Sequence, residues 1–149
     1  MSVLVDSSVL VRLADPADPQ HVIAVDAIDR LLRAGEALFV TLQNLTEAWR
    51  VMTGPKTKNG LGFPVPVADA ELSRLEQLFA VLPEDTPAIA AEWRRLIVHH
   101  QVIDLDVFDA RLAATVLVHG LKCILTFDTG FTRYGVTALD PATASLGGQ

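Results

Sequence analysis

The chain has 149 residues, half of them hydrophobic, and a formal net charge of −6. A chain of this length is most simply one domain, residues 1–149, which can bury a core without disulfide bonds or structural metal ions. The acidic charge argues against a protein that coats nucleic acid, because Lys and Arg dominate phosphate contacts. It does not exclude a nuclease whose carboxylates hold a divalent cation.

No apolar run approaches the roughly 20 residues that span a bilayer, and the first residues lack the basic and long apolar regions of a signal peptide. We therefore expect a soluble cytoplasmic protein without membrane contact. The lone cysteine, Cys123, lies in the apolar stretch CILTF. It cannot form an intramolecular disulfide and is expected to be a buried thiol.

The first half of the chain alternates short apolar runs with helical patterns. The expected elements are a buried strand at VLVDS (3–7), a short helix at SSVLVRLA (7–14), a helix at HVIAVDAIDRLLRAG (21–35), a second strand at ALFVT (37–41) and a helix at LQNLTEAWRVMT (42–53). Gly35 stands where a helix C-cap belongs. Residues 54–66 are rich in Gly and Pro and are expected to form an exposed loop with a functional role.

The second half continues the alternation. The expected elements are helices at 67–82, 85–102 and 106–120, a third strand at KCILTF (122–127), a short final strand or edge at GVTALDP (135–141) and a tail at 143–149. Pro87 falls near the first turn of its helix, where proline is tolerated. Short apolar strands that alternate with helices predict an α/β fold, with a parallel sheet covered on both faces.

Asp6 lies where the first apolar run meets two serines, and two interpretations are open. Asp and Ser residues before a helical stretch are good N-cap residues, because their side chains accept hydrogen bonds from free N–H groups of the first turn. Alternatively, Asp6 ends the first strand of the sheet, where catalytic groups and ligands gather outside the carboxyl ends of strands.

Three more acids interrupt or close apolar segments, namely Glu47, Asp109 and Asp128. Each alone could be a cap, a turn residue or a solvated helix position. Carboxylates that gather raise one another's pKa, and a hard divalent cation is the usual reason to bring them together. Mg²⁺ and Mn²⁺ favour carboxylate oxygens. His99 and His100 are adjacent and Cys123 is single, so the spacing does not suit zinc.

Four passages together resemble the PIN-domain ribonucleases, of the type found as VapC toxins of toxin–antitoxin pairs. They are LVDSSVLVRL, TLQNLTEAWRVMT with the following NGLG, DARLAA and ILTFD. The resemblance implies a PIN-like three-layer α/β/α sandwich, with a central parallel sheet of about four or five short strands. It also implies an endoribonuclease dependent on Mg²⁺ or Mn²⁺, in which the metal lowers the pKa of the water that attacks an RNA phosphodiester.

The resemblance also implies roles for single residues. Asp6 would be the central metal ligand and Asp109 its partner, Glu47 a ligand or water orienter, and Asp128 an outer or second-metal ligand. Hydroxyl groups would support the site from Ser7, Ser8 and Thr126. The TFDTGF passage is compressed relative to relatives that read TFN followed three residues later by an aspartate, so Asp128 replaces one of two polar groups. In a second interpretation Asp128 only starts a turn.

Basic residues are candidates for RNA contact, namely Arg12, Arg50, Lys56, Lys58 and Arg111. The lysines could equally be ordinary solvated loop residues, and the arginines could balance the acids. Trp49 and Trp93 are expected in the core, and His99 and His100 at the surface or an interface.

The resemblance implies two protein partners, a small antitoxin and a second copy of the chain. For the homodimer we expect the helices at 67–82 and 86–101 to form the surface. Two other functions were weighed. Aspartyl-phosphate phosphohydrolases carry a second Asp two residues after the nucleophile, but Ser8 stands there. A catalytically degenerate PIN domain that binds a metal or a partner remains open.

Overall fold

A computed structural model describes residues 2–144 of the chain, and its centre is a five-stranded sheet in the order β3-β2-β1-β4-β5. All neighbouring strands are parallel. The strands are β1 (Ser2–Val5), β2 (Ala37–Thr41), β3 (Ala80–Leu82), β4 (Cys123–Leu125) and β5 (Ala138–Leu139). In the middle of the sheet Leu4 pairs with Phe39 on one side and with Ile124 on the other.

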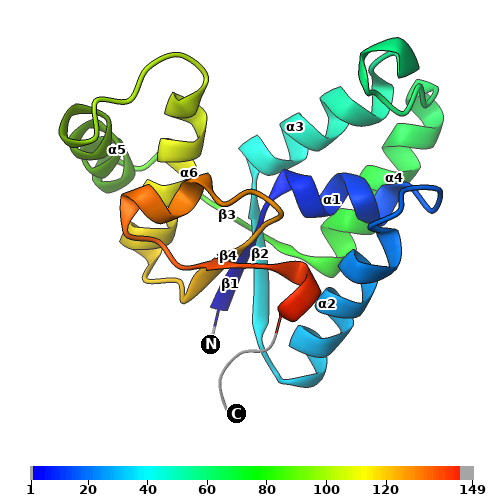
Figure 1. The fold of residues 1–149 in the computed structure, drawn as a ribbon, viewed down its shortest axis with the longest axis horizontal. Helices are drawn as coiled ribbons and strands as arrows, with labels where there is room; N and C mark the ends of the chain where they lie inside the picture. The colour runs from blue at the N-terminus through cyan, green and yellow to red at the C-terminus, as the bar shows by residue number, and fades with distance from the viewer. Residues whose placement is uncertain (1, 145–149) are drawn as a thin grey trace.

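Helices cover both faces of this sheet. They are α1 (Ser7–Ala14), α2 (His21–Arg33), α3 (Leu42–Thr53), α4 (Val65–Leu78), α5 (Pro87–His99) and α6 (Asp106–His119). Short 3-10 turns are η1 (Lys56–Lys58), η2 (Gly130–Tyr134) and η3 (Pro141–Thr143). Figure 1 shows α1 to α4 on one side of the sheet and α5 and α6 on the other. The expected α/β/α sandwich with a parallel sheet is confirmed.

The two faces separate because strand side chains alternate between them. Val3 and Val5 of β1 belong to one buried cluster, together with residues of α1, α2, α3 and α4. Leu4 belongs to the second cluster, with Ile124 and residues of α5 and α6. Burial on both faces explains why β1 reads as an uninterrupted apolar run.

Helix starts lie directly at the strand ends. Only Asp6 separates β1 from α1, and α3 begins immediately after β2 ends at Thr41. Thr41 caps α3, since its hydroxyl accepts from the backbone N–H of Asn44, and the Asn44 side chain accepts from the Thr41 N–H in return. These tight strand-to-helix turns fix the direction of α1 and α3 at one edge of the sheet.

One predicted helix is wrong over its last turn. The chain leaves α4 at Leu78, and residues 80–82 of the predicted 67–82 helix form strand β3. Val81 pairs with Val40 of β2. The run LFAVL is short and apolar, and periodicity cannot tell such a run in a helix from one in a strand. The third predicted strand is consequently the fourth of the sheet.

The loop expected at 54–66 is more ordered than its composition suggests, and α4 already begins at Val65. Its backbone folds back on the end of α3, with hydrogen bonds from Leu61 N–H to Val51 O (2.9 Å) and from Phe63 N–H to Met52 O (2.8 Å). A Cβ at Gly60 would overlap the backbone carbonyl group of Gly54, so this turn requires glycine.

Other expectations concern single residues and the membrane. Cys123 is fully buried and free, as predicted. Trp49 and Trp93 are half-buried and pack against core clusters, whereas His99 is exposed. Gly35 follows the C-cap of α2 with a φ of 78°.

Within residues 2–144, none of the helices has the length and apolar character to cross a membrane. Most of the predicted tail lies outside the described residues.

We expect Gly60→Ala to destabilise the protein by about 1–3 kcal/mol, because an overpacked site must push backbone apart. Urea unfolding measures this change. Gly35→Ala serves as a comparison, because Gly35 has a positive φ, which Gly60 lacks, and no atom within 4 Å of an added Cβ. It isolates backbone strain, about 1–2 kcal/mol. A Gly60→Ala protein as stable as wild type would contradict the tight packing of the loop.

Candidate active site

The four acids singled out in the sequence line one cavity of about 650 Å³. We call it the acidic cavity, and it is lined by Asp6, Ser7, Ser8, Val11, Arg12, Asp15, Asp18, Glu47, Val51, Asn59, Gly60, Leu61, Asp109 and Asp128. The acids reach it from the end of β1, from α3, from α6 and from the turn after β4. Segments more than 100 residues apart in the chain therefore meet at the carboxyl edge of the sheet.

Asp6 is buried, with 6% of its surface exposed, and is tied to both neighbouring segments. Its backbone N–H donates to Leu125 O of β4 at 3.0 Å. Its Oδ2 accepts from the hydroxyls of Thr126 (2.8 Å) and Ser8 (2.9 Å). Asp6 occupies the N-cap position of α1, yet its side chain makes no capping hydrogen bond. Asp6 thus both directly follows β1 and occupies the N-cap position of α1, and the backbone N–H groups of Ser7 and Ser8 also act on its carboxylate.

Burial raises the pKa of Asp6, and the hydrogen bonds from Thr126 and Ser8 oppose that rise. The same hydroxyls also order the turn after β4. Ser8 Oγ accepts from the backbone N–H of Phe127 (3.1 Å), and Thr126 Oγ1 accepts from that of Asp128 (2.9 Å). Ser8 and Thr126 thus link Asp6 to the segment that carries Asp128.

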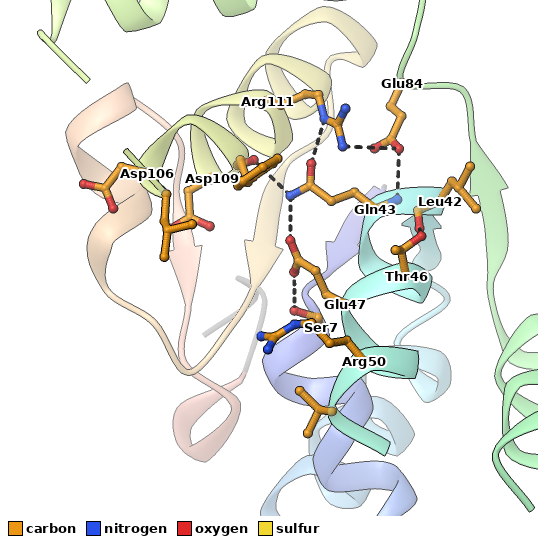
Figure 2. Close-up of a pocket in the computed structure, with 13 residues that line it drawn as sticks. Ser7, Leu42, Gln43, Thr46, Glu47, Arg50, Glu84, Asp106, Asp109 and Arg111 are labelled. Carbon is orange, nitrogen blue, oxygen red and sulfur yellow. Dashed lines mark hydrogen bonds and ion pairs between the residues drawn. The ribbon is translucent and has the colours of Figure 1, made fainter. Parts of the chain in front are cut away.

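Glu47 is half-buried, and both of its carboxylate oxygens are held. Ser7 Oγ donates to Oε2 at 2.7 Å, and Gln43 Nε2 donates to Oε1 at 2.8 Å. Figure 2 shows Glu47 between these two partners, with Asp109 on the opposite side of the space. Two donors that point at one carboxylate fix its direction.

Asp109 differs from Asp6 and Glu47 because its carboxylate accepts no hydrogen bond from any residue between 2 and 144. Burial, followed by the negative charges of Asp6, Asp128, Glu47 and Asp106, raises the pKa of Asp109 to about 7. Asp109 therefore experiences both its own burial and the negative charges of the neighbouring carboxylates. Asp106 and Asp109 both lie in the first turn of α6.

Asp128 is exposed and fits both interpretations offered for it. Its Oδ1 accepts from the backbone N–H of Gly130 at 2.8 Å, which is the bond of a turn residue. It also lines the acidic cavity. Its remaining oxygen has no hydrogen-bond partner among the described residues.

No cation neutralises this cluster from within the described part of the chain. None of the ion pairs among residues 2–144 involves Asp6, Glu47, Asp109 or Asp128. In the same residues, no group of three or more His, Cys, Asp or Glu side chains is placed to hold a metal ion. The donor chemistry of the cavity suits a hard divalent cation, whereas its side chains, as they stand, do not form a closed coordination shell.

The basic candidates divide between two places. Arg12 lines the acidic cavity, and its guanidinium is held by Gln20 Oε1 (2.7 Å) and Ser8 O (2.7 Å) and lies over the Phe127 ring. Arg50 and Arg111 line a second cavity of about 830 Å³, described next. Lys56 and Lys58 are exposed on η1 and line neither cavity.

The second cavity, here the arginine-lined cavity, is shown in Figure 2 and adjoins the acidic cavity through shared lining residues. It is lined by Ser7, Leu42, Gln43, Thr46, Glu47, Arg50, Val51, Glu84, Leu105, Asp106, Phe108, Asp109 and Arg111. The two cavities share Ser7, Glu47, Val51 and Asp109. Glu47 and Asp109 therefore stand on the boundary between two cavities that both contain acids, one with Arg12 and the other with Arg50 and Arg111.

Sequence reasoning missed Gln43 and Glu84, whereas the cavity wall at 59–61 belongs to the 54–66 loop that was expected to have a functional role. Gln43 lies four residues before Glu47, on the same helix face, which is a signal that could have found it. Glu84 follows β3, so the rule that marked the other strand-end acids would have applied if β3 had been recognised.

A family model described as PIN domain matches residues 3–136. Solved structures share the fold over nearly the whole chain. VapC20 of Mycobacterium tuberculosis, described as a sarcin–ricin loop cleaving toxin, is 20% identical with a TM-score of 0.65, and the match covers 91% of this chain and 96% of VapC20. FitAcB from Neisseria gonorrhoeae is 25% identical with a TM-score of 0.66, over 93% of this chain and 97% of that one.

A third structure, VapBC2 from Rickettsia felis bound to a DNA fragment from its promoter, is 11% identical with a TM-score of 0.69, over 93% of this chain and 97% of that chain. At identities of 20% and 11%, the similarity of this chain to VapC20 and to VapBC2 shows a shared fold alone. A comparison with curated proteins gives no match.

We expect Asp109→Asn to stabilise the protein in the presence of a chelator at pH 8 and to have little effect near pH 4. Between 3.8 and about 7, folded Asp109 keeps a proton that the unfolded chain has released. The free energy of unfolding of wild type therefore falls as the pH rises through this window. The shift is worth at most about 4 kcal/mol, and solvent screening of a half-buried group reduces this to about 1–2 kcal/mol.

Thermal unfolding at several pH values measures this gain, at about 2–4 °C for each kcal/mol. Asp69→Asn is the matched control, because Asp69 is exposed on α4. A stability difference for Asp109→Asn that does not change between pH 4 and pH 8 would show that the neighbouring carboxylates do not act on Asp109.

Proposed function

This chain belongs to the PIN-domain family, and from that premise we propose that it is a metal-dependent endoribonuclease that hydrolyses RNA phosphodiester bonds. The observation that carries the proposal is the meeting of Asp6, Glu47, Asp109 and Asp128 in one cavity without a neutralising cation among residues 2–144. Carboxylates that gather without a cation raise one another's pKa and destabilise the fold, so their meeting indicates a function other than stability. The structural similarity to VapC20, a toxin described as cleaving the sarcin–ricin loop, supports RNA as the substrate class.

We infer that Mg²⁺ or Mn²⁺ is the cofactor and that Asp6 and Asp109 hold it, with Glu47 and Asp128 as further ligands. The donor set supports this choice, because both ions prefer carboxylate oxygens. Since no three of these groups are in place to hold an ion together, three or more of them would share one ion only after side-chain movement, whereas two carboxylates and water molecules are enough for Mg²⁺. When bound, such a cation would lower the pKa of water and neutralise charge that develops on the phosphate.

The residues of the chain would prepare the site in different ways. The hydroxyls of Ser8 and Thr126 both bind Oδ2 of Asp6 and fix that carboxylate. Ser7 holds Glu47 from the other side of the cavity. Asp109 has no such partner in the described chain and has a pKa of about 7, so its carboxyl group is free to turn and to exchange a proton near neutral pH. A cation nearby would favour its ionised form.

Arginines at the boundary of the site are the proposed phosphate contacts. Arg12 faces the acidic cavity and Arg50 the arginine-lined cavity. Lys56 and Lys58 lie on the exposed η1 turn and would contact RNA only outside these cavities. Arg111 already donates to Gln43, and its Nη2 lies 3.9 Å from Glu84 Oε1. RNA contact at Arg111 stays a prediction, because RNA would compete with these two partners for the guanidinium group.

A toxin role and an antitoxin partner are proposed from the relatives. The R. felis and N. gonorrhoeae structures are VapBC and FitAB complexes bound to DNA, and this chain has the fold of their toxin components. We propose that a small antitoxin protein binds this chain. A homodimer through the helices at 67–82 and 86–101 also stays a prediction, and exposed Val98, Val81 and Val67 supply apolar surface there.

For the ribonuclease proposal we expect purified protein to cleave RNA with Mg²⁺ or Mn²⁺ and not with chelator. Asp6→Asn and Asp109→Asn should each lower the cleavage rate about 100-fold or more, equivalent to about 2.7 kcal/mol of transition-state stabilisation. Asp69→Asn, on the exposed face of α4, is the control and should retain wild-type activity.

Two results would count against this proposal in different ways. Mn²⁺ binding without cleavage of any RNA would favour the catalytically degenerate PIN domain, which binds a metal or a partner without catalysis. Equal cleavage by wild type and both Asn variants would show that the acidic cavity is not the active site.

For the toxin role we expect expression of the wild-type chain to arrest bacterial growth and Asp6→Ala to abolish the arrest. The reason is that Asp6 is the most buried of the four acids and is bound to the β4 backbone and to the hydroxyls of Thr126 and Ser8. Growth curves and matched expression levels measure this effect. Co-expression of a small protein encoded next to this gene should restore growth, and harmless expression of the wild type would contradict the toxin role.

A further inference from the structure

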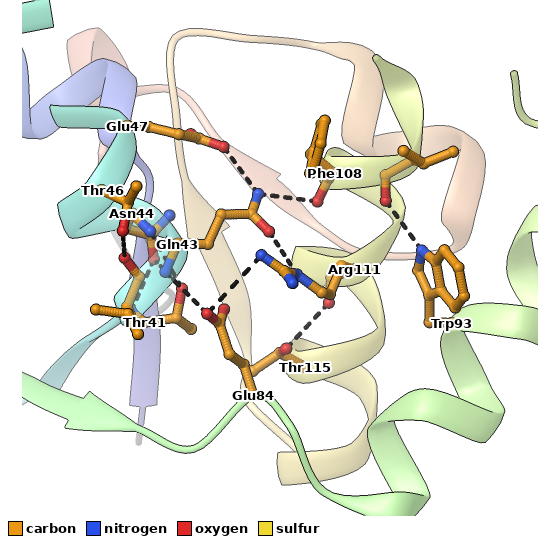
Figure 3. A network of polar contacts seen from close by, with 12 residues as sticks. Thr41, Gln43, Asn44, Thr46, Glu47, Glu84, Trp93, Phe108, Arg111 and Thr115 are labelled. Atoms are coloured by element: carbon orange, nitrogen blue, oxygen red, sulfur yellow. Dashed lines mark hydrogen bonds and ion pairs between the residues drawn. The ribbon is translucent and has the colours of Figure 1, made fainter. Parts of the chain in front are cut away.

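Gln43 connects the two acids that face each other across the cavities. Its side-chain Nε2 donates to Oε1 of Glu47 at 2.8 Å and to the backbone carbonyl of Phe108 at 3.0 Å. Phe108 immediately precedes Asp109 on α6. One buried side chain on α3, 5% exposed, therefore binds the Glu47 carboxylate and the backbone next to Asp109. Figure 3 shows these contacts.

Arg111 determines which way the Gln43 amide points. Arg111 Nε donates to Gln43 Oε1 at 2.7 Å. A guanidinium group can only donate and a backbone carbonyl can only accept, so the amide oxygen must face Arg111 and the NH₂ group must face Phe108 O and Glu47. The reversed amide would lose all three hydrogen bonds. The Gln43 NH₂ group is consequently fixed as a donor toward Glu47 Oε1.

Glu84 completes the network from the loop after β3. Its Oε1 accepts from the backbone N–H of Gln43 at 2.9 Å and lies 3.9 Å from Arg111 Nη2. A carboxylate at the first turn of α3 also complements the helix dipole. Backbone and side chain of Gln43 are thus both fixed, by two different elements of the fold (Figure 3).

We propose that Gln43 is a positioning residue, which sets the direction of the Glu47 carboxylate and its separation from Asp109, and that Arg111 acts by fixing the Gln43 amide. This inference rests on the proposed function, because Glu47 and Asp109 matter as a pair only if they share a metal ion or a substrate. Partners that orient metal ligands in this way affect metal affinity or activity by about 10- to 100-fold when they are removed.

The rival explanation is that Gln43 only bridges α3 and α6 and stabilises the fold. Gln43→Met keeps a side chain of similar length and removes the donor to Glu47 without adding charge. Gln43→Glu keeps an acceptor for Arg111, and therefore one of its two contacts with α6, but replaces the donor toward Glu47 and Phe108 O by a second carboxylate oxygen. Gln77, exposed on α4, supplies the matched controls Gln77→Met and Gln77→Glu.

We expect Gln43→Met to weaken Mn²⁺ binding, measured by calorimetry, by about 10- to 100-fold, with the Gln77 controls unchanged. In RNA cleavage, Gln43→Met and Gln43→Glu should lower kcat by a similar factor and leave KM nearly constant. Thermal unfolding identifies folded variants. If Gln43→Met does not fold, the kcat and KM of Gln43→Glu decide.

A double-mutant cycle separates positioning from simple bridging. If Gln43 acts through Glu47, Gln43→Met should cause no further loss of Mn²⁺ affinity in a Glu47→Gln background. Two results would overturn the inference, provided that Glu47→Gln itself still impairs the protein. One is full additivity of the losses of Mn²⁺ affinity caused by Gln43→Met and Glu47→Gln. The other is wild-type Mn²⁺ affinity and kcat in both folded Gln43 variants. If wild type neither binds Mn²⁺ nor cleaves RNA, the proposed function itself fails and the inference falls with it.

Discussion

Concentrated negative charge at the carboxyl edge of the sheet is the constraint around which this molecule is arranged. Asp6, Glu47, Asp109 and Asp128 line the acidic cavity together with two further acids, Asp15 and Asp18, and no ion pair within residues 2–144 involves any of them. Two of the acids are held by neutral donors instead. The hydroxyls of Ser8 and Thr126 donate to Asp6. The hydroxyl of Ser7 and the amide of Gln43 donate to Glu47. Neutral donors orient a carboxylate without cancelling its charge, so the cavity keeps its attraction for a cation.

The sheet makes this arrangement rigid. Leu4 packs into one buried cluster, and Val3 and Val5 into the other, so β1 is held from both faces and Asp6 leaves it at a fixed point. The parallel pairing with β4 places the Thr126 turn beside Asp6. Packing energy far from the cavity therefore secures the positions of groups that would otherwise repel each other.

The acids are not equivalent. Asp6 and Glu47 are each fixed by two side-chain donors, whereas Asp109 has none in the described chain, and burial and its acidic neighbours raise its pKa to about 7. The α6 backbone beside Asp109 is nevertheless anchored, because Phe108 O accepts from Gln43. A fixed backbone with a free carboxyl group suits a ligand that completes its coordination shell only when an ion arrives.

The sequence by itself determined the α/β class, most of the elements and the identity of the acids, because strand burial on both faces and strand-end carboxylates are local patterns. It did not determine β3, since a short apolar run after a helix pairs as a strand only when β2 offers a free edge. Nor did it determine that Arg111, predicted to contact RNA, would bind Gln43 68 residues earlier. Only the tertiary structure decides such contacts, because a side-chain hydrogen bond between distant segments depends on how whole helices pack and leaves no periodic trace in the chain.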